Sequence, residues 1–261
     1  MRVLALDTTT PAGSVALIED DVEDVDAAGD RVVRVAPVVT VRGGDPTRTH
    51  AARLPAEILG VLEARGLAIA DVDLFAVASG PGSFTGLRIG IATIQGLAFV
   101  HRRRAVGVST LEALAHTVAA VRAPGEIVAA WMDAHRREVF SARYRVTAAA
   151  PFTPERLVEI DGPAVGDPAA TLARWAGGGV PSVVAGDGAV VYGDVIRGSL
   201  ALAAIVDPPS LAGAIGRLAL ARARTGDSVD PAALRPVYVR RPDAEIAREN
   251  SPPQRSRRTP G

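Results

Sequence analysis

The chain has 261 residues, and its 29 basic and 29 acidic side chains give a formal net charge of zero, so no overall field favours nucleic acid or membranes. It has no cysteine, which excludes disulfides, thiol nucleophiles and cysteine-ligated zinc. It also has no lysine, which excludes a phosphate-binding or Schiff-base lysine. No apolar run approaches the roughly 20 residues that span a bilayer. The short run before Asp7 is not a secretory signal, and we expect a cytoplasmic protein.

The first half of the chain alternates predicted strands and helices. Residues 2–6 and 14–18 predict two strands joined by a turn-rich segment, a β-hairpin. An acidic segment, 19–30, is expected at a hairpin tip before a valine-rich strand over 31–42. A predicted helix over 49–65 has an apolar stripe on one face. The pattern then predicts a buried strand, a helix, a short strand and a helix, over 74–78, 85–100, 105–108 and 110–121.

A similar cycle begins after residue 125. Two paired strands are followed by an irregular proline-rich stretch, a helix, a strand, two helices and an extended piece, over 127–132, 138–146, 151–168, 169–176, 182–185, 190–196, 210–224 and 236–240. The repetition predicts an α/β protein of two related lobes, 1–108 and 109–240, and the helix over 210–224 could pack back on the first lobe. Residues 241–261 are charged and proline-rich, and we expect them to be disordered.

A glycine-rich segment over 79–90 connects the buried strand to a helix. Backbone N–H groups at such a helix start can bind an anion. Alternatively, Gly86 and Gly90 share one helix face, which Thr93 continues, and let another element approach closely. A helical glycine costs about 1 kcal/mol relative to alanine, so we favour close approach. The approaching element is either the chain's own second lobe or a partner helix.

Several motifs occur in order along residues 1–240. They are residues 4–9 (Leu-Ala-Leu-Asp-Thr-Thr), Thr49-His50, Leu54-Pro55, the segment 80–90, residues 107–111 (Gly-Val-Ser-Thr-Leu), residues 132–134 with Glu138-Val139, and residues 236–240 (Pro-Val-Tyr-Val-Arg). Together they resemble the TsaB family, also called YeaZ. The resemblance implies two ribonuclease-H-like lobes of the actin/sugar-kinase/Hsp70 (ASKHA) class.

The resemblance also implies a function. TsaB works with TsaD and TsaE, which together transfer threonylcarbamoyl from its adenylate to N6 of adenosine 37 in tRNAs that read codons beginning with A. TsaB is the non-catalytic subunit, so we expect no enzyme activity of the chain alone, a homodimer in the absence of TsaD, and indirect contact with tRNA. It implies no cofactor of the chain's own, although ATP could be bound by the whole complex.

The resemblance favours a partner interface for the glycine-rich segment. The expected interface residues are Gly82, Ser83, Phe84, Thr85, Gly86, Arg88, Gly90, Thr93 and His50. Arg88 could pair with a carboxylate of the partner, whereas a solvated surface arginine is the alternative. His50 could equally cap its helix.

A metal site is not expected. TsaD carries a metal-binding His-x-x-x-His pair, and this chain has Thr110 and Leu114 in the corresponding register. None of its four histidines forms such a pair. Ser83 lacks the Gly-x-Ser-x-Gly spacing of a nucleophile, so no catalytic residue is predicted.

Two loops could contact a nucleotide. Asp7, Thr8 and Thr9 follow the first strand, where ATPases of this fold wrap a phosphate, and Gly186, Asp187 and Gly188 are the counterpart in the second lobe. The alternatives are an Asx turn and an ordinary glycine turn. Asp133, His135, Arg136 and Arg137 predict a polar hairpin tip.

Two other functions stay open. The Asp7 and Asp187 loops would suit an independent ASKHA-type ATP-dependent phosphotransferase or a metallopeptidase. The arginines at 102–104 and in the tail could meet tRNA phosphates, although no aromatic residues are interleaved for base stacking.

Overall fold

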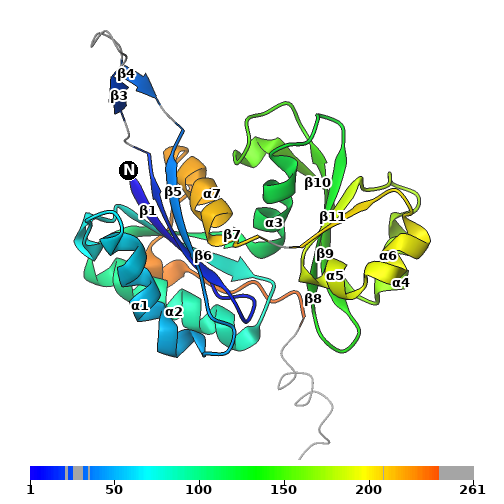
Figure 1. Ribbon diagram of the computed structural model, residues 1–261, viewed down its shortest axis with the longest axis horizontal. Coiled ribbons are helices and arrows are strands. Elements are labelled where there is room, and N and C mark those ends of the chain that lie inside the picture. Colours follow the sequence, from blue (N-terminus) through cyan, green and yellow to red (C-terminus); the bar gives the residue numbers. More distant parts are fainter. Residues whose placement is uncertain (21–22, 26–31, 35, 208, 241–261) are drawn as a thin grey trace, which may run out of the picture.

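A computed structural model describes residues 1–20, 23–25, 32–34, 36–207 and 209–240. These residues form two lobes side by side, each built on a five-stranded sheet (Figure 1). The tail predicted to be disordered, 241–261, and most of the acidic segment 19–30 lie outside the described residues.

The first lobe has a mixed sheet in the order β5-β2-β1-β6-β7. The predicted hairpin forms its centre, since β1 (Arg2–Asp7) pairs antiparallel with β2 (Ser14–Glu19), which pairs antiparallel with β5 (Val38–Gly43). On the other side, β6 (Leu74–Gly80) lies parallel to β1, and β7 (Arg104–Ser109) lies parallel to β6. The short helix η1 (Ile69–Asp71) precedes β6. The helices α1 (His50–Glu63) and α2 (Phe84–Val100) cover the outer face (Figure 1).

The prediction of a single strand over 31–42 is wrong. The chain instead forms two strands, β4 (Val32–Arg34) and β5. β4 pairs with β3 (Glu23–Val25) in a separate ribbon, which projects from the first lobe in Figure 1.

The second lobe repeats the topology of the first. Its order is β10-β9-β8-β11-β12, in which β8 (Ile127–Asp133), β9 (Val139–Val146) and β10 (Leu157–Gly166) are antiparallel neighbours. β11 (Val183–Ala185) and β12 (Ala204–Val206) extend the sheet in parallel. The helices on its outer face are α4 (Pro168–Trp175), α5 (Asp187–Val191) and α6 (Gly193–Ser199). Two copies of this strand order confirm the predicted ASKHA fold of two ribonuclease-H-like lobes.

The prediction of an irregular stretch over 151–168 is wrong. After the short helix η2 (Pro154–Arg156), β10 runs through most of it. β10 is an edge strand, and its register shifts between Asp161 and Ala164, at Pro163. Proline is tolerated at edges and bulges because no ladder hydrogen bond is needed there.

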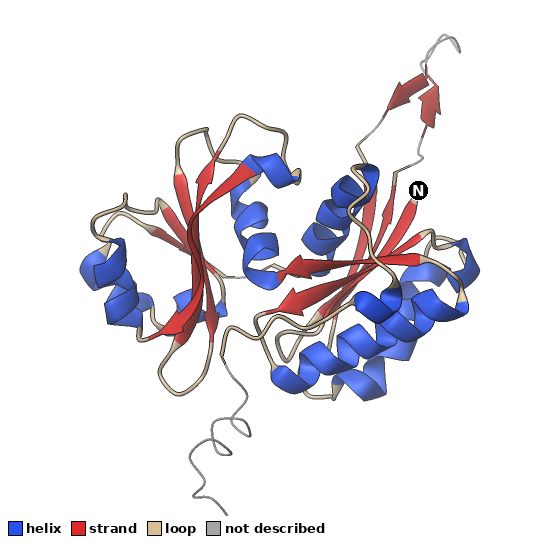
Figure 2. Cartoon of the chain, turned by 180° about the vertical axis from the view of Figure 1, so that it is seen from behind, coloured by secondary structure: helices blue, strands red, loops and turns tan. Residues whose placement is uncertain are grey.

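Two helices join the lobes. α7 (Ala212–Arg224) packs on β1, β2 and β6 of the first sheet, and α3 (Thr110–Ala119) packs on β8 and β9 of the second. The two helices, which lie between the sheets in Figure 2, also contact each other, so one apolar core runs from sheet to sheet. After α7 the chain passes through η3 (Pro231–Ala233), which packs on α2.

His116 of α3 lies in this shared core. Its side chain is fully buried, and neither ring nitrogen has a hydrogen-bond partner among the described residues. The ring stacks on Phe152 with 6.2 Å between centroids. Burial, with the nearby Arg222 and Arg156, lowers the pKa of His116 to about 4.

This burial predicts a pH dependence of stability. Because unfolded His116 takes up its proton near pH 6.5 and folded His116 only near pH 4, the free energy of unfolding should fall as pH falls through that window. We expect the wild type to lose up to about 3 kcal/mol relative to His116→Leu over this range. Urea unfolding of both proteins at a series of pH values measures this loss of unfolding free energy. His101→Gln, at the end of α2, is the control. Parallel pH curves for the wild type and His116→Leu would contradict the prediction.

Candidate functional site

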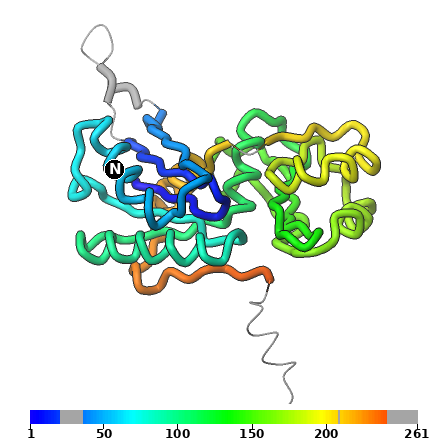
Figure 3. The backbone as a smooth tube through the Cα atoms, turned by 60° about the horizontal axis from the view of Figure 1, so that its bottom comes forward, coloured from blue at the N-terminus to red at the C-terminus, as the bar shows by residue number. Residues whose placement is uncertain are grey.

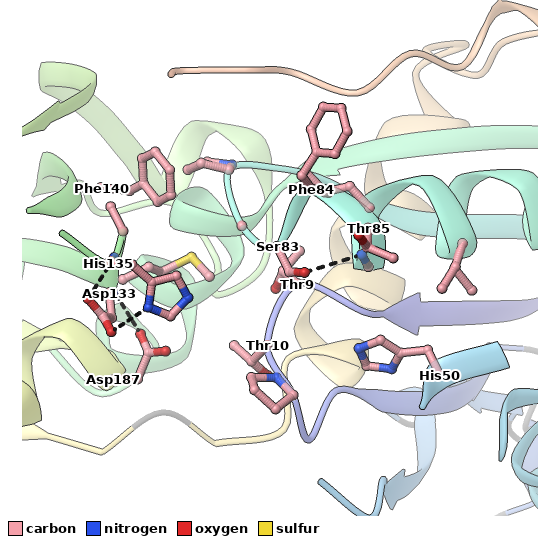
Figure 4. A pocket seen from close by; sticks show the side chains of 18 of the residues that line it. Thr9, Thr10, His50, Ser83, Phe84, Thr85, Asp133, His135, Phe140 and Asp187 are labelled. Carbon is pink, nitrogen blue, oxygen red and sulfur yellow. Dashed lines mark hydrogen bonds and ion pairs between the residues drawn. The ribbon is translucent and has the colours of Figure 1, made fainter. Parts of the chain in front are cut away.

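A cleft of about 790 Å³ lies between the lobes. Figure 4 shows the side chains of Thr9, Thr10, Ser83 and His50 on its first-lobe side, opposite Asp133, His135 and Asp187 of the second lobe. It therefore brings together two sites that the sequence predicted separately, the partner interface of the glycine-rich segment with His50 and the nucleotide site formed by two counterpart loops.

The Asp7 loop is closed on itself. The Asp7 carboxylate accepts hydrogen bonds from the Thr9 backbone N–H (2.9 Å) and hydroxyl (2.6 Å), which is the Asx-turn alternative. The Thr9 carbonyl accepts from the Ser83 N–H at 2.9 Å. Asp7 is 3% exposed, and this burial raises its pKa despite the two hydrogen bonds. The Thr9 N–H is therefore engaged within the loop, and the Asp7 carboxyl is buried behind Thr9, which itself lines the cleft.

In the Asp187 loop, too, backbone N–H groups bind the chain's own carboxylate. The Asp187 carboxylate accepts from the N–H groups of Asp133 (3.1 Å) and Gly188 (2.8 Å) at the start of α5. A Cβ at Gly186 would lie 1.8 Å from the Trp131 carbonyl oxygen, so this glycine permits close approach to β8. Burial raises the pKa of Asp187, and the charge of Asp133 adds to it. Nucleotide contact by either loop stays a prediction.

Two glycines of α2, Gly86 and Gly90, face the chain's own first lobe. A Cβ at Gly86 would lie 1.9 Å from the Thr8 carbonyl oxygen, and one at Gly90 would lie 2.3 Å from the Thr8 hydroxyl. Gly82 faces Thr9 in the same way. The approaching element is therefore the loop after β1, neither the second lobe nor a partner helix. The prediction that Gly86 and Gly90 face a partner is wrong, because both are buried against Thr8.

The other predicted interface residues on α2 differ in exposure. Ser83, Phe84, Thr85 and Arg88 are exposed, and the Ser83 hydroxyl caps the helix by accepting from the Gly86 N–H at 3.3 Å. Thr93 is half-buried and donates its hydroxyl hydrogen bond to the Ile89 carbonyl at 2.8 Å.

A longer exposed face of α2 was missed by sequence reasoning. Thr85, Arg88, Ala92, Gly96 and Phe99 lie three or four residues apart and are all exposed, so they form one stripe, the open face of α2. Phe99 is 78% exposed, and a Cβ at Gly96 would have no neighbour within 4 Å. The sequence did carry one signal for this face, namely the aromatic residue Phe99 on a helix face that has no buried residue beside it.

His50 lies at the start of α1 and lines the cleft. Its Nδ1 is 2.6 Å from the Arg53 guanidinium, and burial together with Arg53 lowers the pKa of His50. Arg53 is itself buried, pairs with Glu57 at 2.8 Å and donates to the carbonyls of Pro11 and Ala12. It thereby fixes the turn between β1 and β2. Arg53 was not expected in the site, because an arginine on a helix is usually solvated.

The polar hairpin tip is confirmed as the connection between β8 and β9. The His135 N–H donates to the Asp133 carboxylate at 2.9 Å, and the two side chains meet at 3.2 Å (Figure 4). Thr110 and Leu114 are buried in α3. Within the described ranges, no group of three or more histidine or acidic side chains is arranged to hold a metal ion.

In the part of the chain that the structure describes, none of the helices combines the length and apolar character needed to cross a bilayer.

Comparison with known proteins gives consistent names. Residues 44–187 match the model of a family described as TsaD, tRNA N6-adenosine threonylcarbamoyltransferase. The chain is 34% identical to the tRNA threonylcarbamoyladenosine biosynthesis protein TsaB of Escherichia coli K12 over 56% of this chain and 55% of that protein. It is 31% identical to an uncharacterized protein of Mycobacterium tuberculosis H37Rv over 93% of each.

The similarity extends to solved structures. YeaZ from Pseudomonas aeruginosa superposes with a TM-score of 0.68 at 30% identity, covering 91% of this chain and 99% of YeaZ. Among the curated relatives, the chain spans 58% of an uncharacterized protein of Mycobacterium leprae and 55% of E. coli TsaB.

Proposed function

Because this chain belongs to the TsaB (YeaZ) family, we propose that it acts in threonylcarbamoyladenosine biosynthesis in tRNA as a non-catalytic subunit. Its partners in this proposal are TsaD and TsaE in the cytoplasm. TsaD transfers threonylcarbamoyl from its adenylate to N6 of adenosine 37 in tRNAs that read codons beginning with A. The chain has no cofactor of its own, meets tRNA only through its partners, and pairs with a second copy when TsaD is absent.

The observation that carries the non-catalytic role is the state of the two cleft loops. The N–H groups of Thr9, Asp133 and Gly188 already bond to the chain's own carboxylates. A phosphate that binds these N–H groups would have to displace those carboxylates, and in the cleft it would meet the Asp187 carboxyl, which carries a charge of its own sign. With these three N–H groups engaged, the two loops are poorly suited to bind a phosphate directly, as the nucleotide loops of an independent phosphotransferase would.

The open face of α2 supports the partner role. Its centre, Ala92 and Gly96, is small enough for the close approach of another helix, and Phe99 and the neighbouring Phe84 add apolar area at its two ends. Aromatic and arginine side chains are the residue types that most often anchor protein interfaces. We propose this face as the docking surface for TsaD or for a second copy of the chain.

A reconstituted assay tests the proposal. Purified TsaD and TsaE with tRNA and the threonylcarbamoyl adenylate should modify adenosine 37 only when this chain is added. Calorimetry of the chain alone with ATP and magnesium should give no turnover. Full modification without the chain, or turnover by the chain alone, would contradict the proposal.

The state of Asp7 leads to a stability prediction. Its raised pKa means that the folded state favours the protonated carboxyl, so stability is lost as pH rises through that folded pKa. Asp7→Asn, which keeps the oxygen that accepts from Thr9 but stays neutral, should therefore unfold at higher urea concentration than the wild type at pH 7. The difference should vanish below the unfolded pKa near 3.8. A less stable Asp7→Asn at pH 7 would mean that an ionised Asp7 is needed by the fold.

A further inference from the structure

The last described residues, 234–240, form a segment that we name the C-terminal strap. It begins on the first lobe, where the Leu234 side chain is 5% exposed in the core and its carbonyl accepts from the Gln95 side chain at 3.3 Å. The Val237 N–H then donates to the Ser79 carbonyl at the end of β6, at 2.7 Å. The strap is therefore anchored along the first lobe up to Val237.

The far end of the strap binds the second lobe. Arg240 donates to the Ala134 carbonyl at 2.7 Å and pairs with the Glu138 carboxylate. Its guanidinium also lies 5.6 Å from the centroid of the Phe140 ring. All three partners belong to the β8–β9 hairpin, so Arg240 is a non-covalent link between the lobes.

Between its two ends the strap forms a wall of the cleft and touches the docking surface. Val237, Tyr238, Val239 and Arg240 line the cleft. The Tyr238 ring lies 5.2 Å from the Phe84 ring, and its hydroxyl accepts from Arg88 at 3.3 Å. Tyr238 thus covers the N-terminal end of α2, next to the open face.

The chain also crosses between the lobes at two covalent places. These are the junction of β7 with α3 and the connection from β12 to α7, on the inner face of the first sheet. The strap instead follows α2 on the outer side of that sheet before it reaches the second lobe, as the orange tube in Figure 3 shows. A hinge motion about α3 and α7 that widens the cleft must therefore break either the contacts of Arg240 on the second lobe or the bond of Val237 to Ser79 on the first.

We propose that the strap is a latch that holds the cleft closed and that TsaD docking on the open face of α2 releases it. A partner that packs on Phe84 competes with Tyr238, and displaced Tyr238 weakens the hold of Arg240 on the second lobe. Occupation of the docking surface and opening of the cleft are then linked, and the linkage is reciprocal. The linkage rests on the proposed function, whereas the latch itself is a property of the lone chain.

The latch is tested by a distance measurement in the full chain. Because the chain has no cysteine, Leu59→Cys on α1 and Leu202→Cys on the second lobe, both well exposed, accept one spin label each. Arg240→Ala should shift the interlabel distances to longer values, and Glu138→Gln should shift them in the same direction. Arg235→Ala is the matched control, since among the described residues this exposed strap arginine donates only to the nearby carbonyls of Ala232 and Leu234. Wild-type distances in a folded Arg240→Ala chain would overturn the latch.

The linkage is tested by affinity for TsaD. If docking releases the strap, then Arg240→Ala should bind TsaD about fivefold or more tightly than the wild type does, because the release has already occurred. TsaD should also lengthen the interlabel distances in the wild type. Equal affinities of Arg240→Ala and wild type would overturn the linkage. If the wild type fails to bind TsaD at all, the proposed function fails with the linkage, whereas the distance result still decides the latch.

Discussion

Replacing Gly86 with alanine should lower the free energy of unfolding by about 3 kcal/mol. The new Cβ would lie 1.9 Å from the Thr8 carbonyl oxygen, a backbone atom that cannot rotate away. Thr8 is further held by its hydroxyl, which donates to the Gly86 carbonyl at 2.8 Å. The gain of about 1 kcal/mol in helix propensity does not offset this clash. Urea unfolding of the variant at neutral pH measures the loss.

Gly96 on the same helix provides the matched control. Its position is exposed, and an added Cβ would meet nothing within 4 Å. Gly96→Ala should therefore raise the free energy of unfolding by about 1 kcal/mol through helix propensity alone. Equal losses in Gly86→Ala and Gly96→Ala would contradict the assignment of one glycine to internal packing and the other to the open face.

Replacing Ala92 with arginine should abolish association with TsaD. Ala92 lies at the centre of the open face, so a long charged side chain there keeps a partner helix at a distance and adds a charge that docking would desolvate. We expect at least about a 100-fold loss of affinity, or close to 3 kcal/mol. Fold stability should change little because the side chain is exposed. Co-purification and a binding titration with TsaD measure the loss.

Ala173→Arg controls for the added charge. Ala173 is an exposed alanine on α4, a helix on the outer face of the second lobe. This variant should bind TsaD as the wild type does. If Ala92→Arg binds normally while both variants stay folded, the open face of α2 is not the docking surface.

The repeated strand order was largely predictable because it depends on local patterns. The hairpin over 2–6 and 14–18 and the pair over 127–132 and 138–146 each mark the start of a lobe, and both pairs occur in the structure. The proline-rich composition gave a wrong prediction, because the rule that proline interrupts a strand has an exception at bulges and edges. Pro163 suggested irregular structure, yet it lies at a bulge in the edge strand β10.

The site was less predictable because its contacts join distant residues. Gly86 meets Thr8, which is 78 residues earlier, and the Tyr238 ring packs against Phe84, whose position in the sequence gives no sign of that contact. The spacing of Gly86 and Gly90 did indicate close approach to α2. It could not indicate which element approaches, and the approaching element is the loop after β1.

The most direct test of the central claim, that this chain contributes a docking surface and not chemistry, is the rate of threonylcarbamoyl transfer with TsaD and TsaE. The doubly substituted Asp7→Asn and Asp187→Asn chain should support a rate close to that of the wild type, whereas Ala92→Arg should support none. A loss of about 100-fold or more in the double variant, the size expected for removing a general acid or base, together with normal transfer by Ala92→Arg, would contradict the claim.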